Sequence, residues 1–103
     1  MAIVRTALRA DLEIELAAIW WRKHRPSAPL TFDFELSTAF VFLSESWEAQ
    51  PVLFRHLGAD IRRYRLAKTD YFVFYRYDQR DDEVIVLSVW HARRGRDPFR
   101  QRR

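Results

Sequence analysis

A chain of 103 residues, of which 49% are hydrophobic and 16% aromatic, holds enough apolar material for one folded core, so disorder is excluded and a single domain over residues 1–103 is expected. The absence of cysteine excludes disulfides, thiol nucleophiles and metal sites built on cysteine. The net charge of +4 is uneven, because the basic residues concentrate after Phe54. A basic half in a small domain favours an acidic partner, and a solvated surface that only keeps the protein soluble is the alternative.

The start of the chain lacks the pattern of a secretion signal. Met1–Val4 are followed at once by Arg5 and Arg9, and no apolar run in the sequence reaches the length of a membrane span. A cytoplasmic protein without a membrane partner is therefore expected.

The first elements are a short strand and a helix. The apolar segment Ile3–Arg5 predicts an edge strand, and Thr6 is a candidate N-cap for the helix that follows. Apolar residues then recur at intervals of three and four to about Lys23, which predicts a helix with one apolar stripe: Leu8, Leu12, Leu16, Ile19 and Trp20. The segment 25–29 contains two prolines and ends this helix.

A second helix is predicted from between Ser27 and Thr31 to about Glu48, antiparallel to the first. Its main apolar stripe is Phe32, Leu36, Ala39, Phe40, Leu43 and Trp47. Further apolar residues fall on its other faces: Leu30, Phe34, Val41 and Phe42. Either the domain wraps this helix on more than one side, or the helix keeps a surface for a partner chain.

After Pro51 the apolar period changes from helical to two. Three strands are predicted at Ile61–Leu66, Tyr71–Tyr77 and Val84–His91, and the short polar turns between them favour an antiparallel meander. The helical hairpin would cover one face of this sheet, and the strand arginines would emerge on the other. The fold class is therefore α+β, with a basic, irregular tail at about residues 95–103.

Most catalytic motifs are absent from the sequence. Gly58 and Gly95 are the only glycines, so neither a P-loop nor a dinucleotide-binding motif can form. The three histidines lack any paired spacing, so no metal site and no cofactor are expected.

Basic side chains on the strands form the candidate site. Alternation places Arg63 and Arg65 on one face of their strand. The remaining members lie on the next strand or at the end of the last one: Arg76, His91, Arg93 and Arg94. Guanidinium groups match phosphate bidentately, and a histidine can also move a proton. The alternative is an exposed sheet face kept soluble by charge.

Three segments resemble the C-terminal half of RelE/ParE family toxins: Leu57–Leu66, Tyr71–Arg76 and Val84–Arg94. Ala10–Leu12 and Leu43–Pro51 are similar to the family's helical part. The resemblance implies a β-α-α-β-β-β fold, in which an N-terminal strand and an antiparallel helical hairpin pack on a C-terminal antiparallel meander. It also implies a growth-inhibiting toxin that a cognate antitoxin protein neutralises, forming toxin–antitoxin hetero-oligomers.

The family contains two mechanisms, and the resemblance implies site residues for each. RelE-type toxins cut messenger RNA on the ribosome, and that activity would use the set His91, Arg63, Arg65 and Arg93. ParE-type toxins poison DNA gyrase, and target binding would then use the set Arg63, Arg65, Arg76, His91, Arg93 and Arg94. For the antitoxin, Phe34, Val41 and Phe42 are the expected contacts.

Two positions depart from the nuclease pattern. Phe72 stands where the nucleases carry a phosphate-binding arginine, and Phe99 stands at best where they carry a terminal tyrosine. These losses remove a donor to the transition state and a base for the 2′-hydroxyl, although His91 could replace the base. The ParE-like interpretation is therefore favoured, the messenger RNA endonuclease is the alternative, and an inactive toxin fold that only binds a partner is the third hypothesis.

Overall fold

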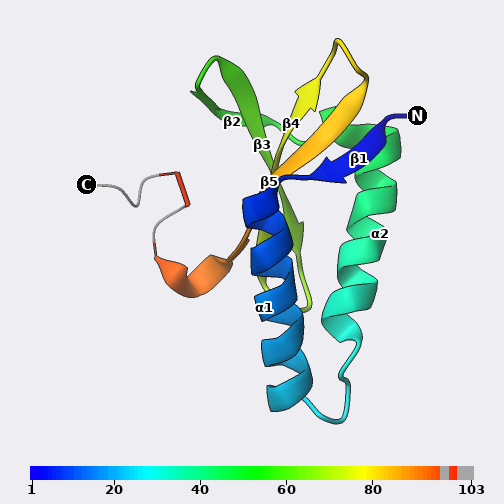
Figure 1. Cartoon of the computed structure of the whole chain (residues 1–103), viewed down its shortest axis with the longest axis vertical. Helices are drawn as coiled ribbons and strands as arrows, with labels where there is room; N and C mark the ends of the chain where they lie inside the picture. The colour runs from blue at the N-terminus through cyan, green and yellow to red at the C-terminus, as the bar shows by residue number, and fades with distance from the viewer. Residues whose placement is uncertain (96–97, 100–103) are drawn as a thin grey trace.

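The computed structural model describes residues 1–95 and 98–99 and shows two helices packed against one face of a five-stranded mixed sheet (Figure 1). The elements in chain order are β1 (Ile3–Thr6), α1 (Leu8–His24), α2 (Thr31–Ser46), the 3₁₀ turn η1 (Trp47–Ala49), β2 (Val52–His56), β3 (Ala59–Leu66), β4 (Tyr71–Asp78), β5 (Glu83–His91) and the 3₁₀ turn η2 (Ala92–Arg94). The sheet order is β1-β5-β4-β3-β2, with β1 parallel to β5 and the other neighbours antiparallel. The predicted α+β fold is confirmed.

The meander contains one strand more than the sequence predicts. Strand β2 pairs antiparallel with β3 through a hairpin whose two turn residues, Leu57 and Gly58, both have positive φ angles of 52° and 79°. Such a turn matches the twist of the two strands it joins. The strand was missed because it is short, ends in Arg55 and His56, and shows no clean alternation of buried and exposed residues.

The start of α1 also differs from its prediction. Thr6 is the last residue of β1, paired with Val86, and the helix begins at Leu8 after Ala7, which makes no side-chain cap bond. The Thr6 hydroxyl donates instead to the Asp11 carboxylate in the first helical turn. Strand pairing therefore places Thr6 on the sheet and leaves its hydroxyl to bond with a side chain.

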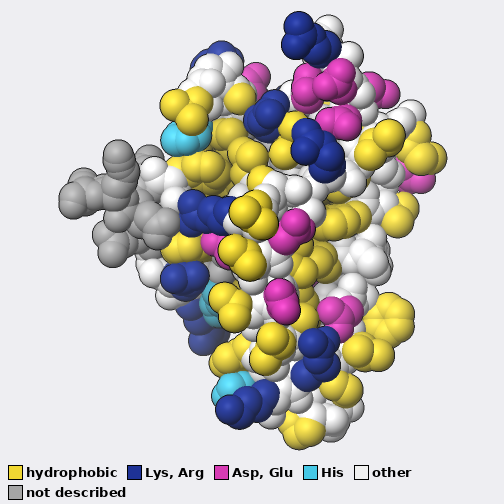
Figure 2. Space-filling model, in the orientation of Figure 1, with side chains coloured by type: hydrophobic (Ala, Val, Ile, Leu, Met, Phe, Trp, Pro, Cys, Tyr) yellow, Lys and Arg dark blue, Asp and Glu magenta, His cyan; other side chains and the backbone are white. Residues whose placement is uncertain are grey.

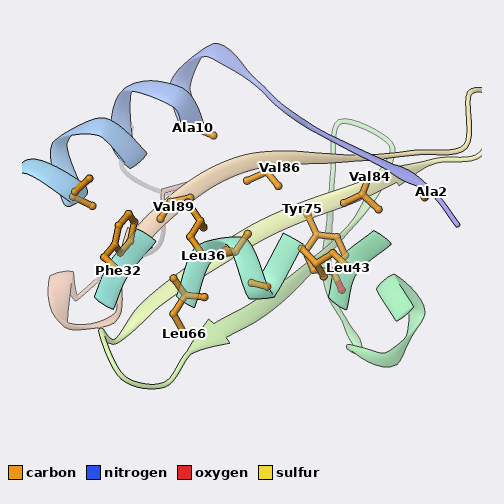
Figure 3. Packing of buried hydrophobic residues seen from close by; sticks show 14 residues of the cluster. Ala2, Ala10, Phe32, Leu36, Leu43, Leu66, Tyr75, Val84, Val86 and Val89 are labelled. Carbon is orange, nitrogen blue, oxygen red and sulfur yellow. The ribbon is translucent and has the colours of Figure 1, made fainter. Parts of the chain in front are cut away.

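The main core lies between the helices and the sheet (Figure 3). The predicted stripe of α2 faces it, with Phe32, Leu36, Ala39 and Leu43 buried. The predicted stripe of α1 does not. Its side chains are 44–74% exposed, and the buried positions of α1 are alanines 10, 17 and 18. Small side chains let α1 approach the sheet closely, which leaves the larger apolar side chains on the outside.

A second, smaller cluster covers the opposite face of the sheet. Ile61, Phe74 and Trp90 are buried there, and partly buried residues that include Phe54, Phe72 and Leu87 pack against them. Phe99 joins this cluster, with its ring centroid 5.4 Å from that of Phe54 and 5.4 Å from that of Phe74. The rest of the predicted tail beyond Gly95, apart from Pro98, lies outside the described residues. This face is therefore aromatic as well as basic.

Tyr75 links the sheet to the end of the helical hairpin and should make stability depend on pH. Its side chain is fully buried and its hydroxyl donates to the Trp47 carbonyl oxygen at 2.7 Å. Burial raises the pKa of Tyr75 from 10.0 to about 12, with the Arg62 charge acting in the opposite direction. The contribution of a neutral Tyr75 is complete below pH 10 and declines as the pH rises towards 12.

We expect Tyr75→Phe to lower the free energy of unfolding by about 1 kcal/mol near pH 8, because the Trp47 carbonyl loses its donor. The difference in free energy of unfolding between the two proteins should narrow above pH 10. Over this range the wild type loses up to roughly 1.4 kcal/mol of stability per pH unit, and the variant, which lacks the phenol, does not. Urea unfolding curves at pH 8 and pH 11 would measure both values. A gap that stays constant over this range would contradict the prediction.

Candidate target-binding surface

The candidate surface is the sheet face opposite the helices. Tyr64 and Leu66 of β3 pack towards the helices. Because successive side chains of a strand point to opposite faces, Arg63 and Arg65 lie on the other face. The guanidinium carbon of Arg63 lies 4.0 Å from the ring centroid of Phe72. Within residues 1–95 and 98–99, Arg63 forms no ion pair. Its charge is therefore held in place by an aromatic ring and remains available to an acidic target.

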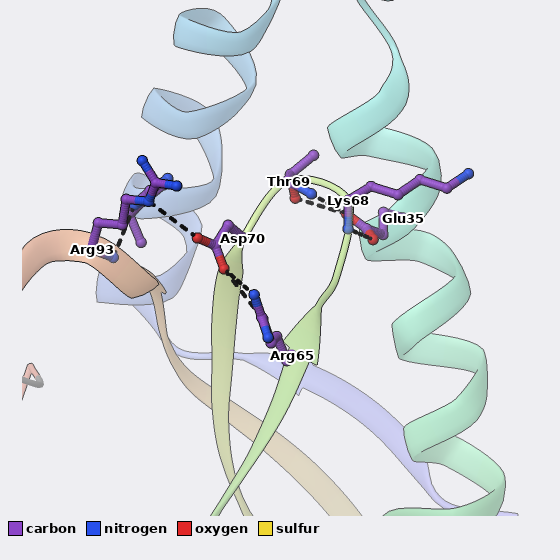
Figure 4. Close-up of polar contacts among 7 residues, drawn as sticks. Glu35, Arg65, Lys68, Thr69, Asp70 and Arg93 are labelled. Atoms are coloured by element: carbon purple, nitrogen blue, oxygen red, sulfur yellow. Dashed lines mark hydrogen bonds and ion pairs between the residues drawn. The ribbon is translucent and has the colours of Figure 1, made fainter.

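Asp70 connects two of the predicted site residues (Figure 4). Its Oδ1 accepts hydrogen bonds from Arg65 Nη2 at 2.8 Å and Nε at 3.2 Å, and its Oδ2 lies 3.7 Å from Arg93 Nε. One carboxylate thus brings together arginines from β3 and η2. Sequence reasoning treated Asp70 only as part of a polar turn and missed this role.

The turn that carries Asp70 is fixed to α2. Glu35 accepts hydrogen bonds from the backbone N–H of Lys68 at 2.6 Å and of Thr69 at 3.0 Å, and from the Thr69 hydroxyl at 2.8 Å. Asp70 itself has a φ of 66°, which aspartate tolerates better than most residues. The position of the Arg65 and Arg93 side chains therefore depends on a contact between the sheet and a helix.

The adjacent residues Arg93 and Arg94 have different partners. The guanidinium carbon of Arg94 lies 3.8 Å from the ring centroid of Trp90, and that of Arg9 lies 5.7 Å from the same ring. Trp90 is 6% exposed, so it is a rigid platform that belongs to the second apolar cluster. Arg94 is thereby held on the candidate surface, whereas Arg93 points towards Asp70.

His91 lies on the helix side of the sheet. It pairs with Tyr71, a residue of the main core, and the two rings meet edge to face with centroids 4.9 Å apart. Its Nδ1 accepts the backbone N–H of Arg93 at 3.2 Å, so Nε2 carries the proton of the neutral ring. Burial raises the pKa of Tyr71, against the opposing charge of Arg94, so its hydroxyl stays protonated at neutral pH.

Arg76 is separated from the other members of the predicted set. It pairs with Ile85, five residues along β4 from Tyr71, a distance of about 17 Å along the strand. There it lines a groove with Arg55 and Arg62. The structure thus brings Arg63 near Arg65 and links Arg65 to Arg93 through Asp70. His91 lies beside Arg93 on the helix side of the sheet, and Arg76 is separated from the rest.

The residues predicted to contact an antitoxin lie on α2, and α1 adds to them. Phe34 and Val41 are 69% and 58% exposed, whereas Phe42 is partly buried with its ring centroid 5.1 Å from that of Tyr64. The exposed stripe of α1 extends this apolar surface, and Figure 2 shows hydrophobic side chains over the outer side of both helices. This larger surface is called the outer hairpin surface below and comprises Leu8, Leu12, Leu16, Ile19, Trp20, Phe34 and Val41.

The described part of the chain offers few features that could bind a metal ion or span a membrane. Carboxylate oxygens of Asp78, Asp81 and Glu83 lie within 4.8 Å of one another in the turn after β4, an arrangement also common in solvated acidic turns. Neither helix combines the length and the apolar composition needed to cross a membrane.

Comparisons with known proteins agree with this architecture. A family model described as the ParE toxin of the type II toxin-antitoxin system parDE matches residues 5–96. The fold is similar to a structure described as the chromosomal ParDE system from P. aeruginosa, with a TM-score of 0.70 and 12% identity over 88% of this chain and 96% of that chain. It is also similar to the isolated RelE toxin of E. coli, with a TM-score of 0.61 and 21% identity over 91% of this chain and 87% of that chain. No curated protein matches the sequence.

Proposed function

From the premise that the chain belongs to the ParE toxin family of type II toxin-antitoxin systems, within the RelE/ParE superfamily, we propose that it arrests bacterial growth by binding DNA gyrase in the cytoplasm and that a cognate antitoxin neutralises it. The observation that carries the choice of target is the position of His91. It lies on the helix side of the sheet, whereas Arg63 and Phe72 lie on the opposite face.

A nuclease of this fold needs its groups on one surface. It must hold the scissile phosphate, stabilise the charge that develops there and activate the 2′-hydroxyl, all within hydrogen-bond reach of the same substrate. Here the Phe72 ring packs under Arg63, Phe72 pairs with Arg65 across the strands, and Phe99 has no hydroxyl. These features support a toxin that acts by binding.

A binding toxin requires a surface complementary to its target. Arg63 and Arg94 rest on aromatic rings, so their side chains lose little freedom when an acidic surface meets them. Arg65 and Arg93 add charge at the end of the sheet, held by Asp70. This arrangement of arginines suits binding to an acidic protein surface or to the DNA that gyrase holds.

The proposed antitoxin covers the outer hairpin surface. Leu8 and Leu16 are 74% and 67% exposed on one helix, and Phe34 is 69% exposed on the other. An extended or helical chain that buries such side chains would gain affinity from them, and acidic residues in it would speed its association with a basic toxin.

Induction of this protein alone in a bacterial host should reduce colony counts by orders of magnitude, and co-expression of the small acidic protein expected from the neighbouring reading frame should restore them. Plating after induction, with and without the neighbour, measures both effects. Filamentation and DNA damage with intact messages would fit gyrase as the target. Ribosome-dependent messenger cleavage would favour the endonuclease instead, and normal growth with abundant folded protein would favour an inactive binding module.

A further inference from the structure

A groove of about 380 Å³ lies where the end of α1 meets the turn after β3 and the end of β5. Its lining includes Trp20 and Trp21 from α1, Tyr71 at the start of β4, and His91 and Arg93 at and after the end of β5. A hollow of this size is large enough to hold a small molecule. The proposed function uses single residues at its margins, and it assigns no role to the groove itself.

One wall of the groove is aromatic and consists of Trp20 and Trp21. The Trp21 indole N–H donates to the Ala28 carbonyl oxygen at 2.8 Å, which fixes this ring against the turn between the helices. The Trp20 ring stacks on the His24 imidazole, with centroids 4.3 Å apart and planes inclined by 14°. Trp20 is nevertheless 44% exposed. This aromatic wall is therefore already ordered, and it suits a flat ring that stacks on indole.

Two arginines reach the groove from different elements. Arg25 lies over the aromatic wall, with its guanidinium carbon 5.6 and 5.5 Å from the two indole centroids, and it forms no ion pair within the described residues. The Arg93 side chain is 85% exposed and meets Asp70 only at 3.7 Å (Figure 4). Asp70 also accepts two hydrogen bonds from Arg65. Both guanidinium groups can therefore still bind an anion in the groove.

Two further donors line the groove without a partner among residues 1–95 and 98–99. The Tyr71 hydroxyl forms no hydrogen bond there, and neither does Nε2 of His91, whose Nδ1 accepts the Arg93 backbone N–H. The neutral forms of both side chains carry a proton at these positions. A ligand that meets them must supply several acceptors and negative charge. A phosphate monoester does both, and its oxygens match the fork of a guanidinium group.

We propose that this groove binds a free purine mononucleotide. The base lies against the aromatic wall, and the phosphate lies among Arg25, Arg93, Tyr71 and His91. An acidic side chain from a partner protein would satisfy the donors but would leave the indole surface uncovered. A nucleic acid strand carries repeated phosphates, whereas the groove offers one set of donors. This inference is independent of the choice of gyrase as the target.

NMR titration of the ¹⁵N-labelled full chain with AMP, ribose 5-phosphate and adenosine tests the site and its two halves. AMP should shift the indole N–H signals of Trp20 and Trp21 and the backbone signals of Tyr71 and Arg93. Each fragment should bind at least about tenfold more weakly than AMP, because it lacks either the stacking or the charged contacts. Shifts centred on the arginine face of the sheet would place the nucleotide there and overturn the proposal.

Two exposed substitutions separate the base from the phosphate. Trp20→Ala should weaken AMP at least about tenfold and leave ribose 5-phosphate within about twofold. Arg93→Gln should weaken AMP and ribose 5-phosphate at least about tenfold and leave adenosine within about twofold. The matched control Arg80→Gln, in the turn after β4, should leave AMP within about twofold. Variants that weaken all three ligands equally would overturn the proposed orientation of the nucleotide.

Two competitors test the choice of ligand. An adenine hexanucleotide that binds more tightly than AMP would overturn a free nucleotide in favour of a single strand. An octaglutamate peptide that binds as tightly as AMP would assign the groove to an acidic protein segment. Growth arrest is a separate readout: a chain that arrests growth but does not bind AMP retains the proposed function and loses this inference.

Discussion

Replacing Arg93 and Arg94 together with glutamate should abolish growth inhibition, whereas His91→Ala should retain most of it. The Arg93 side chain is 85% exposed, and its contact with Asp70 is long, at 3.7 Å, so the reversal should change the free energy of unfolding by less than about 1 kcal/mol. Arg94 reaches the candidate surface over Trp90. Reversed charges there would repel an acidic target, and like charges at an interface cost several kcal/mol. Colony counts after induction measure the effect.

The matched control for this double variant is Arg80→Glu, which reverses a charge in the turn after β4 without touching η2. Circular dichroism melting curves should show that all variants fold. Toxicity that survives the double reversal would remove η2 from the target surface. If the wild type cleaves messenger RNA and His91→Ala loses both this cleavage and its toxicity, His91 would instead belong to a nuclease site, despite its place on the helix side.

The parts of the fold that sequence predicted well are those in which local pattern and burial agree. The strands β3, β4 and β5 are eight or nine residues long, rich in β-branched and aromatic residues, and separated by polar turns. Helix α2 presents a stripe whose buried members include Phe32 and Leu43. The short strand β2 carries too few residues for its period to be visible. Its existence depends on pairing with β3, which is a tertiary contact.

The stripe on α1 shows the limit of periodicity. A repeat at three and four residues indicates that one helical face is apolar, but it does not indicate what covers that face. On α1 the core takes Ala10, Ala17 and Ala18, and the leucines remain outside. A helix with alanines on one side and leucines on the other is typical of an element that packs closely within its own domain and binds a second chain.

The candidate site was predictable in composition and only partly in geometry. Alternation correctly placed Arg63 beside Arg65 on one face, because that follows from the pleat of a strand. The roles of Asp70 and Glu35 depend on contacts between elements. Glu35 accepts hydrogen bonds from Lys68 and Thr69, which are separated from it by 33 and 34 positions in the sequence. Likewise, the register between β4 and β5 contains an irregularity after Phe74, so counting along the strands could not show that His91 lies beside Tyr71.

Leu16→Asp should abolish neutralisation by the antitoxin while leaving the toxin folded and active. Leu16 is 67% exposed in the middle of α1, so the substitution buries no charge in the free protein and should change its stability by less than about 0.5 kcal/mol. In the complex, a carboxylate would replace an apolar contact in a dehydrated interface, which typically costs about 2 kcal/mol or more.

The matched control is Leu57→Asp, because Leu57 is 92% exposed in the turn between β2 and β3, away from the helical hairpin. Surface plasmon resonance should then show binding weakened about thirtyfold or more for Leu16→Asp alone, and cells that carry this variant should stop growing even with the antitoxin present. Unchanged affinity for Leu16→Asp, with a normal melting curve, would place the antitoxin elsewhere than on α1 and restrict its apolar contacts to α2.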